Sequence, residues 1–388
     1  MNVILFDDQQ TEHLSPFTLT RAAADMRCGI LTIAEKWAKH LGHDISIMAQ
    51  EHLAKKYPHQ IEADNLFING RALPQQHLID AIYLLNMGEA LMHNNILLAY
   101  RGEYFSHQFL NTFEYAEAVI ISRIHHLFTY NQQEIVNDFL LLTKGRESGI
   151  LSASNTHFGE YPIFLEKGVK AEAAIFNTTE GPIYLGIDSE VMEGAMIRGP
   201  FALCEHSTVK MGAKIYTGTT VGPHSKVGGE ISNSVIFGYS NKGHDGFLGN
   251  SVLGEWCNLG ADTNNSNLKN NYEDVKLWNY ATQNFERTGL QFCGLMMGDH
   301  SKCGINTMFN TGTVVGVSAN IFGSGFPRNF VPSFAWGGAS GFETYQPKKA
   351  FQTAEKVMQR RGLILSEIDK EILETIFAKE SNYRTWEK

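Results

Sequence analysis

Aliphatic side chains recur at every sixth position over a long central stretch of this chain. When Ile, Leu and Val make up about a fifth of all residues, eight in one register arise by chance on the order of once in a million. A six-residue strand cannot bury its single inward side chain alone. Three such strands close a triangular coil of about eighteen residues, and stacked coils form a continuous aliphatic column. The spacing therefore predicts a left-handed parallel β-helix. The eight positions are Leu185, Val191, Ile197, Leu203, Val209, Ile215, Val221 and Val227.

The same spacing begins before this series and resumes after an interruption. The earlier positions are Ile163, Val169 and Ile175, and the later ones are Met297, Cys303, Phe309, Val315 and Ile321. Between Val227 and Met297, residues 240–272 read SNKGHDGFLGNSVLGEWCNLGADTNNSNLKNNY, which is rich in Asn, Gly and single charges. We interpret this segment as an insertion carried on a rigid prism, where a functional site is expected.

The length of 388 residues exceeds one ordinary core, so we expect two domains and a C-terminal appendage. Residues 1–155 predict an α/β domain with a mostly parallel sheet, because short apolar runs alternate with helical spacing. Its strands are expected at 3–6, 45–49, 66–68 and 96–100, with a helix over 78–93. The β-helix is expected over 156–340. Residues 341–388 predict two helices, at 348–361 and 366–377, which we expect to cap its open end.

The composition limits which cellular compartment and which binding partners are expected. The net charge of −9 and the absence of a long Lys or Arg run argue against a nucleic-acid partner. Five cysteines without a CxxC pair indicate buried thiols in a reduced cytoplasm. The first residues contain no Lys or Arg and become acidic at Asp7, so they predict neither a signal peptide nor a membrane anchor. No apolar run approaches the length that is needed to span a bilayer.

His244, in the sequence GHDG, is the first candidate for acid–base chemistry, because histidine alone has an unperturbed pKa near neutrality. Its flanking glycines allow close approach of a substrate, and Asp245 could orient its ring. A surface or structural histidine is the competing interpretation. The Asn-rich stretch after it can either stabilise left-handed backbone at coil corners or bind sugar hydroxyls. Its members are Thr263, Asn264, Asn265, Asn267, Asn270 and Asn271.

Two histidines are candidate ligands of a metal site. His206 and His224 are one coil of eighteen residues apart and would stack at adjacent levels of an unbroken β-helix. A zinc site needs a third ligand, and the next position in this series is Lys242, which is no ordinary ligand. The pattern therefore favours metal binding only weakly.

Residues 240–267 resemble the acetyltransferase motif of the bifunctional N-acetylglucosamine-1-phosphate uridylyltransferases/glucosamine-1-phosphate acetyltransferases. That motif runs S-K-x-G-H, an aromatic residue, L-G-D and then N-x-G-A-G-T. Residues 298–316, GDHSKCGINTMFNTGTVVG, resemble the continuing coils of the same family. The whole chain is similar to divergent GlmU-related proteins of the Bacteroidetes type, and the similarity is specific over about 180–325.

The resemblance implies a role for individual residues. It makes His244 the general base, Lys242 a contact to the sugar phosphate, Asn267 a contact to the sugar, and Ala261 the backbone beside the acyl-CoA thioester. Lys276 is a looser match to a later phosphate-binding lysine. Two departures concern the acceptor: Phe247 stands where the family has a tyrosine, and Lys226, in KVGGE, replaces an arginine-rich stretch.

The mechanism that the resemblance implies is direct acetyl transfer. His244 would take a proton while the amine of a glucosamine-type sugar phosphate attacks the carbonyl of acetyl-CoA, and backbone amides would stabilise the oxyanion. The family also implies a homotrimer with sites between subunits. Its setting is the synthesis of UDP-N-acetylglucosamine-type nucleotide sugars for the cell envelope.

Residues 14–31, LSPFTLTRAAADMRCGIL, resemble the stretch L-x-P-L-T-x-x-x-P-K-x-L of sugar nucleotidyltransferases, which implies UTP or another nucleoside triphosphate as ligand. In that family a Gly-rich loop precedes the stretch and cradles phosphates. Here FDDQQTEH takes its place, and Gly29 is the first glycine of the chain. The family's metal-binding aspartate is likewise replaced, by the sequence Asn69-Gly70-Arg71.

A rearranged nucleotide site can still be drawn from the residues present. Arg21 and Arg27 are candidates for phosphate binding, and Asp7 and Asp8 are candidates for holding Mg²⁺. A cation at a helix start and ordinary surface acids are the competing interpretations of these four residues.

Three classes of function remain open from the sequence. The first is a sugar-phosphate N-acetyltransferase fused to a nucleotidyltransferase-like domain. The second is a trimeric nucleotide-sugar-binding or regulatory protein whose N-terminal domain is inactive. The third is a metal hydratase of the γ-carbonic anhydrase type, which shares the β-helix but needs three convergent histidines.

Overall fold

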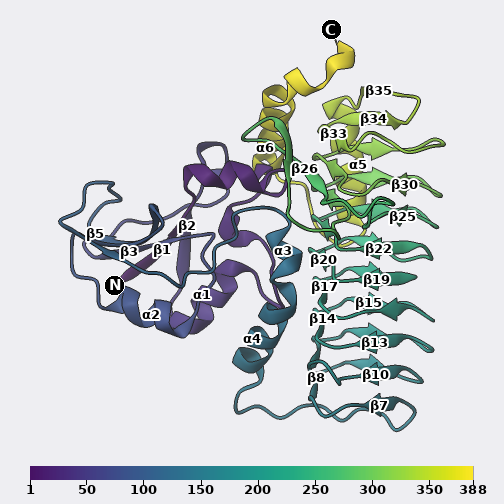
Figure 1. Ribbon diagram of the computed structural model, residues 1–388, viewed down its shortest axis with the longest axis horizontal. Helices are drawn as coiled ribbons and strands as arrows, with labels where there is room; N and C mark the ends of the chain where they lie inside the picture. The colour runs from purple at the N-terminus through teal and green to yellow at the C-terminus, as the bar shows by residue number, and fades with distance from the viewer. Residues whose placement is uncertain (388) are drawn as a thin grey trace.

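The computed structural model describes residues 1–387. An α/β domain lies beside a long β-helix, and two C-terminal helices lie near the last coils (Figure 1). The β-helix is built of three sheets of short strands, nearly all parallel and mostly two or three residues long, which confirms the left-handed β-helix expected from the spacing of six. Among the described residues, no helix has both the length and the apolar character needed to cross a membrane.

The three sheets differ in what covers them. The domain face, which packs against the N-terminal domain, consists of β8 (Ile163–Leu165), β11 (Ile183–Leu185), β14 (Phe201–Leu203), β17 (Thr219–Val221), β20 (Val235–Ile236), β23 (Val252–Leu253), β28 (Met296–Met297), β31 (Val314–Val315) and β33 (Phe330–Val331). The groove face consists of β9 (Lys170–Ala171), β12 (Glu190–Val191), β15 (Thr208–Val209), β18 (Lys226–Val227), β21 (Asn241–Lys242), β24 (Asn258–Leu259), β29 (Lys302–Cys303), β32 (Asn320–Ile321) and β34 (Ala335–Gly338), followed by antiparallel β35 (Gly341–Thr344). The open face consists of β7 (Thr156–Phe158), β10 (Ile175–Asn177), β13 (Met196–Arg198), β16 (Lys214–Ile215), β19 (Glu230–Ser232) and β22 (Phe247–Gly249), and continues with β25 (Asn264–Asn265) and β30 (Met308–Phe309).

The eight aliphatic residues from Leu185 to Val227 all lie in the interior column and are almost completely buried. The interior register predicted before Leu185, which aligns Ile163, Val169 and Ile175 with the later column, is wrong. Leu165 pairs with Leu185 in the ladder between β8 and β11, and Ile175 is 39% exposed on the open face. The main cause is the corner between Asn177 and Ile183, which is three residues longer than the corresponding corner of the next coil, between Arg198 and Phe201.

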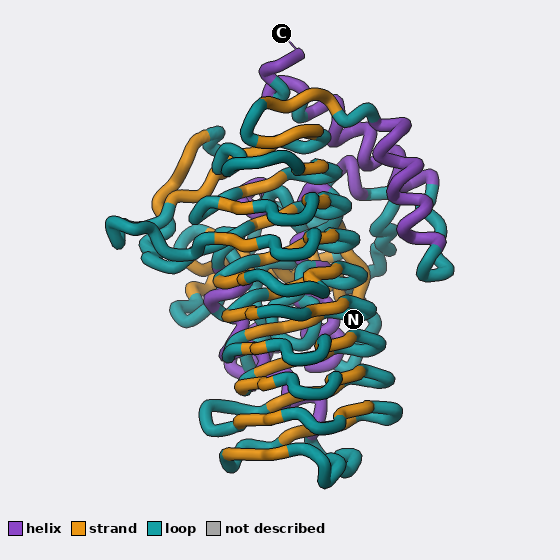
Figure 2. Tube along the Cα trace, turned by 90° about the vertical axis from the view of Figure 1, so that its right-hand side faces the viewer, coloured by secondary structure: helices purple, strands orange, loops and turns teal. Residues whose placement is uncertain are grey.

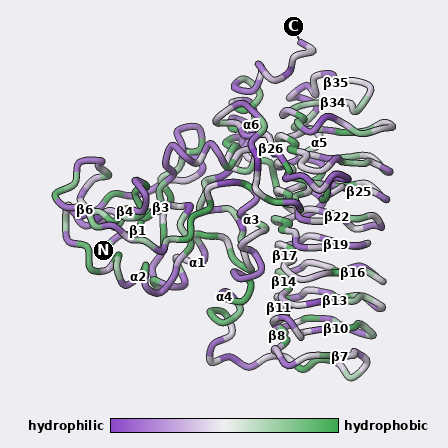
Figure 3. Tube along the Cα trace, in the orientation of Figure 1, coloured by the Kyte–Doolittle hydropathy of each residue, from purple (hydrophilic) through white to green (hydrophobic). Residues whose placement is uncertain are grey.

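The expected insertion after Val227 is also placed differently. The coils continue, and their interior positions are filled by Ile231, Ile236, Leu248, Leu253 and Leu259. Short corners shift the register. The spacing of six is therefore lost, whereas the interior column continues without a break. The segment that does leave the coils begins after Asn265 and contains the hairpin of β26 (Lys276–Asn279) and β27 (Asn284–Arg287). The region around β25 and β26 is strongly hydrophilic (Figure 3).

The N-terminal domain is a six-stranded sheet with helices packed on it. Its strands lie in the order β2 (Ile45–Met48), β1 (Asn2–Phe6), β3 (Asn65–Asn69), β5 (Ile96–Gly102), β4 (Glu89–His93) and β6 (Asn111–Glu114). Its helices are α1 (Ile33–Leu41), α2 (Gln76–Tyr83), α3 (His126–Thr129) and α4 (Asn131–Thr143), and short 3₁₀ turns connect several elements. The first three strands of this order are parallel, whereas β5 pairs antiparallel with both neighbours, so the sheet is more mixed than expected.

The helix predicted over 78–93 ends at Tyr83, and the second half of that stretch forms β4. Gly88 interrupts the segment with a φ of +86°. Asn94 and Asn95 then turn the chain into β5 with φ values of +47° and +67°, as a two-residue hairpin of twisted strands requires. The pairing of β4 with β5 overrides the helical spacing of the leucines.

The N-terminal domain and the β-helix share one apolar core. Val235, Phe237 and Val252 project from the domain face into the core of the α/β domain, and Phe139 of α4 packs edge-on against Phe164. A buried ion pair between Arg21 and Asp299 crosses the same interface. The interface therefore combines extensive apolar burial with a specific polar contact.

The C-terminal helices do not cap the β-helix as expected. Helices α5 (Pro347–Gln359) and α6 (Glu367–Lys379) run along its side (Figure 2), where Ala354 and Met358 pack against Trp256 and Phe334 at the corner between the domain and groove faces. At the end of the β-helix itself, β34 and β35 form a hairpin, and Phe342 and Trp386 pack against the interior column.

Candidate functional site

His244 lies on the corner that joins β21 of the groove face to β22 of the open face. Its side chain is exposed. Gly246, at the end of this corner, has a φ of +108°, and a Cβ there would lie 2.2 Å from the carbonyl oxygen of Thr263. Only glycine fits at that position. The tight corner therefore presents the imidazole outward.

A groove of about 610 Å³ runs between the groove face and the C-terminal end of α5. It brings together three residues singled out from the sequence, His244, Lys226 and Ala261. The carbonyl of Ala261 accepts a hydrogen bond from the Asn306 amide at 2.8 Å, which fixes the corner of the next coil. The groove is lined by Lys210, Lys226, Tyr239, Asn241, Gly243, His244, Trp256, Asn258, Leu259, Gly260, Ala261, Ile305, Val357, Arg360 and Arg361.

The groove is strongly cationic. Lys210, Lys226, Arg360 and Arg361 line it, and none of the lining residues, all of them described, is Asp or Glu. The pKa of Lys226 is lowered by partial burial and by repulsion from Arg361 and Lys210. Like charges held this close repel one another, and the binding of an anionic ligand would reduce that repulsion.

Sequence reasoning missed several of these groove residues. Arg361 is fixed by donating a hydrogen bond from Nη2 to the carbonyl of His224 at 3.0 Å. The pair Arg360-Arg361 is visible in the sequence, but its position over the groove depends on the packing of α5 against the aromatic corner. Asn241 also lines the groove, and its buried side-chain oxygen has no hydrogen-bond partner within the described chain.

The ladder of aromatic rings beside the groove explains the two histidines considered for a metal site. His206 and His224 stack at 4.8 Å, His224 and Tyr239 at 4.8 Å, and Tyr239 and Trp256 at 4.2 Å between ring centroids. The third level of the series is thus an aromatic side chain rather than a metal ligand. Within residues 1–387, no three His, Cys, Asp or Glu side chains are grouped so that they could hold a metal ion.

Lys242 is not placed for contact with a sugar phosphate. It pairs with Val227 in the ladder between β18 and β21, so its side chain enters the interior column, and it is only 1% exposed. The resemblance aligned the residue approximately, whereas the strand register decides its direction. Asn241, the preceding residue, faces the groove instead.

Three further residues proposed from the resemblance lie outside the groove. Phe247 is on β22 of the open face, and Asn267 lies close to it, with its amide donating to the Asn250 side chain at 2.8 Å. Lys276 is exposed on β26. The neighbouring Asn264 and Asn265 accept hydrogen bonds from the backbone amides of Phe247 and Gly249, which is the structural role considered for the Asn-rich stretch.

The arginines proposed for nucleotide binding are buried at the domain interface. Arg21 pairs with Asp299, which also accepts a hydrogen bond from Thr20 at 2.8 Å. Arg27 donates to the carbonyl of Ile30 and lies beside Cys204 of the domain face. Both guanidinium groups are buried at the domain interface rather than exposed to an open cavity, although the Nε of Arg21 has no hydrogen-bond partner in the described residues.

The two carboxylates proposed to hold Mg²⁺, Asp7 and Asp8, already accept hydrogen bonds from the protein. Arg71 donates to both carboxylate oxygens of Asp8, with Nε at 2.9 Å from Oδ1. Asp7 accepts from the amides of Ala23 and Gln50, and burial raises its pKa to about 6. A cation at this place would have to displace the guanidinium of Arg71, so the residues present do not fit the metal.

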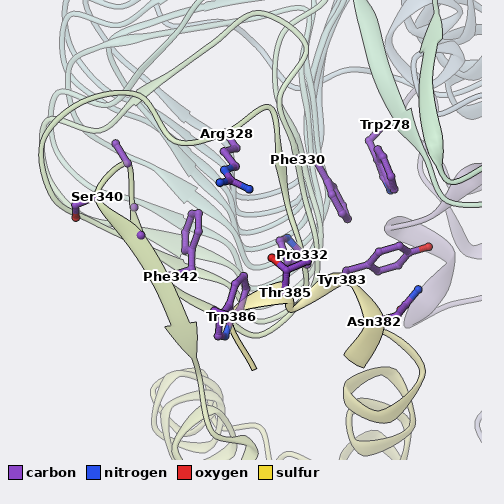
Figure 4. Close-up of a pocket in the computed structure, with 13 residues that line it drawn as sticks. Trp278, Arg328, Phe330, Pro332, Ser340, Phe342, Asn382, Tyr383, Thr385 and Trp386 are labelled. Atoms are coloured by element: carbon purple, nitrogen blue, oxygen red, sulfur yellow. The ribbon is translucent and has the colours of Figure 1, made fainter. Parts of the chain in front are cut away.

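Other cavities are also large enough for small molecules, and two of them concern the residues discussed above or the end of the β-helix. One of about 840 Å³ lies at the carboxyl ends of β1 and β2 and includes Asp7, Asp8, Glu12, Glu51 and Glu380 in its lining, an acidic set unsuited to a triphosphate. The other, of about 550 Å³, lies at the end of the β-helix (Figure 4). Its lining includes Trp278, Arg328, Phe330, Phe342, Tyr383 and Trp386.

We predict that the groove binds polyanions through its four cations. Lys226→Gln and Arg360→Gln are each expected to weaken the binding of inorganic pyrophosphate roughly threefold to tenfold, which is about 0.7–1.4 kcal/mol. Isothermal titration calorimetry measures this. Binding should also weaken as the pH rises through the lowered pKa of Lys226, because the amine then loses its charge.

The matched control is Lys170→Gln, which removes an exposed cation from β9 of the same face, outside the groove. Equal affinities for the groove variants and for the unaltered chain would contradict the assignment of an anion site.

Comparisons with known proteins agree with this two-part architecture. Residues 3–147 match the family model described as sugar nucleotidyl transferase. The chain is 33% identical over 118 residues to the bifunctional protein GlmU of Methanocaldococcus jannaschii, an alignment that spans 30% of this chain and 26% of that protein. It is 25% identical over 153 residues to the uncharacterized acetyltransferase YaiX of Escherichia coli, which spans 39% of this chain and 66% of that protein.

Among solved structures, LpxA from Bacteroides fragilis, a UDP-N-acetylglucosamine acyltransferase, aligns over 61% of this chain and 84% of that chain, at 15% identity and a TM-score of 0.30. The curated relatives are matched over less than two thirds of their own length. The sequence matches, together with the strand register of the β-helix, show that the chain is related to GlmU-type proteins, with a sugar nucleotidyl transferase-like domain preceding a hexapeptide-repeat β-helix.

Proposed function

We propose that this protein transfers an acetyl group from acetyl-CoA to the amine of a glucosamine-type hexosamine phosphate. The observation that carries the proposal is an exposed imidazole, His244, lining a groove that four cations and no carboxylate surround. The acetyltransferase relatives support the acyl donor, and the resemblance of residues 240–267 supports the acceptor.

The charge of the groove suits both substrates. Acetyl-CoA and a hexosamine phosphate each carry phosphate groups, and guanidinium and ammonium groups bind phosphate through charge-assisted hydrogen bonds. Arg360 and Arg361 directly follow the last residue of α5, whereas Lys210 and Lys226 come from the β-helix. A phosphate held between the two elements would fix the substrate relative to His244.

The proposed reaction needs one base and no covalent enzyme intermediate. The amine nitrogen attacks the thioester carbonyl while His244 accepts a proton from the amine. The tetrahedral oxyanion is stabilised by the backbone N–H of Ala261, because the neighbouring N–H of Gly260 already donates to the carbonyl of Cys303 at 3.1 Å. The intermediate then collapses, the carbon–sulfur bond breaks, and the coenzyme A thiolate takes up the proton from the imidazolium.

We predict that His244→Ala lowers kcat for acetyl transfer by about two to four orders of magnitude, because a general base typically contributes that much. The assay follows thiol release from acetyl-CoA across a panel of hexosamine 1-phosphates and 6-phosphates. His206→Ala is the matched control, because His206 lies in the aromatic ladder and outside the groove. Turnover of the His244 variant within a fewfold of normal would remove His244 from this role.

The assembly that we propose is a homotrimer with sites between subunits. The open face exposes apolar side chains, among them Phe158, Ile175, Met196 and Tyr216, along a face that the N-terminal domain leaves uncovered. Phe247 and Asn267 lie on this same face, around the corner from His244. A neighbouring subunit packed there would bring these two residues toward a shared site.

Sedimentation equilibrium should therefore give a mass near three times the 43.4 kDa of the chain. Met196→Lys, which puts a charge at the centre of the exposed apolar row, is expected to shift the protein toward monomers. A monomer at micromolar concentration for the unaltered chain would contradict the trimer.

For the N-terminal domain, we propose a scaffolding or nucleotide-sugar-binding role within the synthesis of UDP-N-acetylglucosamine-type nucleotide sugars. The pairing of Asp8 with Arg71, and the acidic cavity at the strand ends, disfavour uridylyl transfer. The full chain, incubated with UTP, Mg²⁺ and each hexosamine 1-phosphate, is expected to release no pyrophosphate above the enzyme-free rate. Release with any of these sugars would overturn this assignment.

A further inference from the structure

One buried cation in the interior of the β-helix has no counterpart among the neighbouring coils. The position inward from the groove face is Val209, Val227, Leu259, Cys303 and Ile321 in other coils, but it is Lys242 at the level of the candidate site. Burying an ammonium group in an aliphatic column is costly unless its hydrogen-bonding capacity is used. Burial lowers the pKa of Lys242 to about 8.

The Lys242 ammonium donates its hydrogen bonds to backbone carbonyl groups. It forms no ion pair with a carboxylate in residues 1–387. Its Nζ donates to the carbonyl oxygens of Gly228 at 3.2 Å, of Asp245 at 3.0 Å and of His244. Two of these three acceptors lie in the corner that carries the imidazole, and the third lies in the coil below. The three bonds tie the His244 corner to the rigid column from the inside.

The next two coils close the equivalent corner in a different way. In Gly260–Thr263 the threonine hydroxyl donates to the carbonyl of Gly260 at 2.7 Å, and in Gly304–Thr307 it donates to the carbonyl of Gly304 at 2.8 Å. At the level of His244, Gly246 takes the place of the threonine. A Cβ at Gly246 would clash with the carbonyl of Thr263, so a hydroxyl-bearing side chain cannot be used there.

We propose that Lys242 is a positioning residue for His244, an internal ammonium that replaces the threonine hydroxyl of the adjacent corners and holds the imidazole at the edge of the groove. This inference rests on the proposed role of His244 for its effect on turnover. Its structural part, the fixing of the corner, stands on the hydrogen bonds alone.

The test replaces Lys242 with Met, which matches the length and the apolar character of the column but donates no hydrogen bond. We expect amide hydrogen exchange in peptides covering residues 240–248 to rise at least tenfold, while peptides covering 256–264 and 300–308 stay unchanged. We expect kcat for acetyl transfer to fall about 10- to 100-fold, because a misplaced base loses its reactive geometry, while the KM for acetyl-CoA stays within about threefold.

The matched control is Lys302→Met. Lys302 also donates its ammonium to backbone carbonyls, those of Trp256 and His300, but at another corner of the β-helix. It should leave both the exchange of residues 240–248 and kcat near their normal values. If Lys242→Met does not fold, Lys242→Leu, which is shorter and likewise donates no hydrogen bond, carries the same measurements.

Unchanged exchange of residues 240–248 in the Lys242 variant would overturn the proposal, and so would faster exchange spread equally over all coils, which would mark a general role in folding. The two proposals fail separately. Full activity of His244→Ala would refute the catalytic role of His244, whereas the exchange measurement would still decide whether Lys242 fixes the corner.

Discussion

The burial of one side chain per short strand in a continuous interior column is the interaction on which the rest of this structure depends. Each coil contacts only its neighbours, so the column holds the coils in register and thereby sets where every corner lies. His244, Ala261 and Lys226 come from three successive coils, and they meet along the groove because the column stacks those coils. The chemistry proposed for the groove thus depends on aliphatic packing beneath it.

Much of the fold follows from this column, and the departures have identifiable causes. A spacing of six reveals the interior only where the corners keep a constant length. The longer corner before Ile183 and the short corners after Val227 shift the register. The spacing of six therefore places Ile175 in the interior and predicts an insertion where the coils around His244 in fact continue. A polar residue in the column, such as Lys242, hides the pattern further. The hairpin of β4 and β5 likewise required a pairing that local helical spacing does not reveal.

The site was predictable where the backbone alone decides it. GHDG marks a tight corner that presents His244, and the resemblance pointed to Ala261 and Lys226 nearby. The placement of Arg360 and Arg361 required the docking of α5 on the aromatic corner, which no local pattern encodes. The burial of Arg21 and Arg27 required knowledge of the domain interface. In both cases the missing information was a contact between segments far apart in the sequence.

The crowding of positive charge in the groove has a consequence for the protein as a whole. The four cations repel one another, and an anionic ligand that binds them in the folded chain alone would stabilise that chain by mass action. The resistance of this chain to unfolding would therefore rise with the concentration of any anion that fills the groove. The pair Arg360-Arg361, which directly follows α5 and contributes two of the four charges, would be held most firmly when the groove is filled.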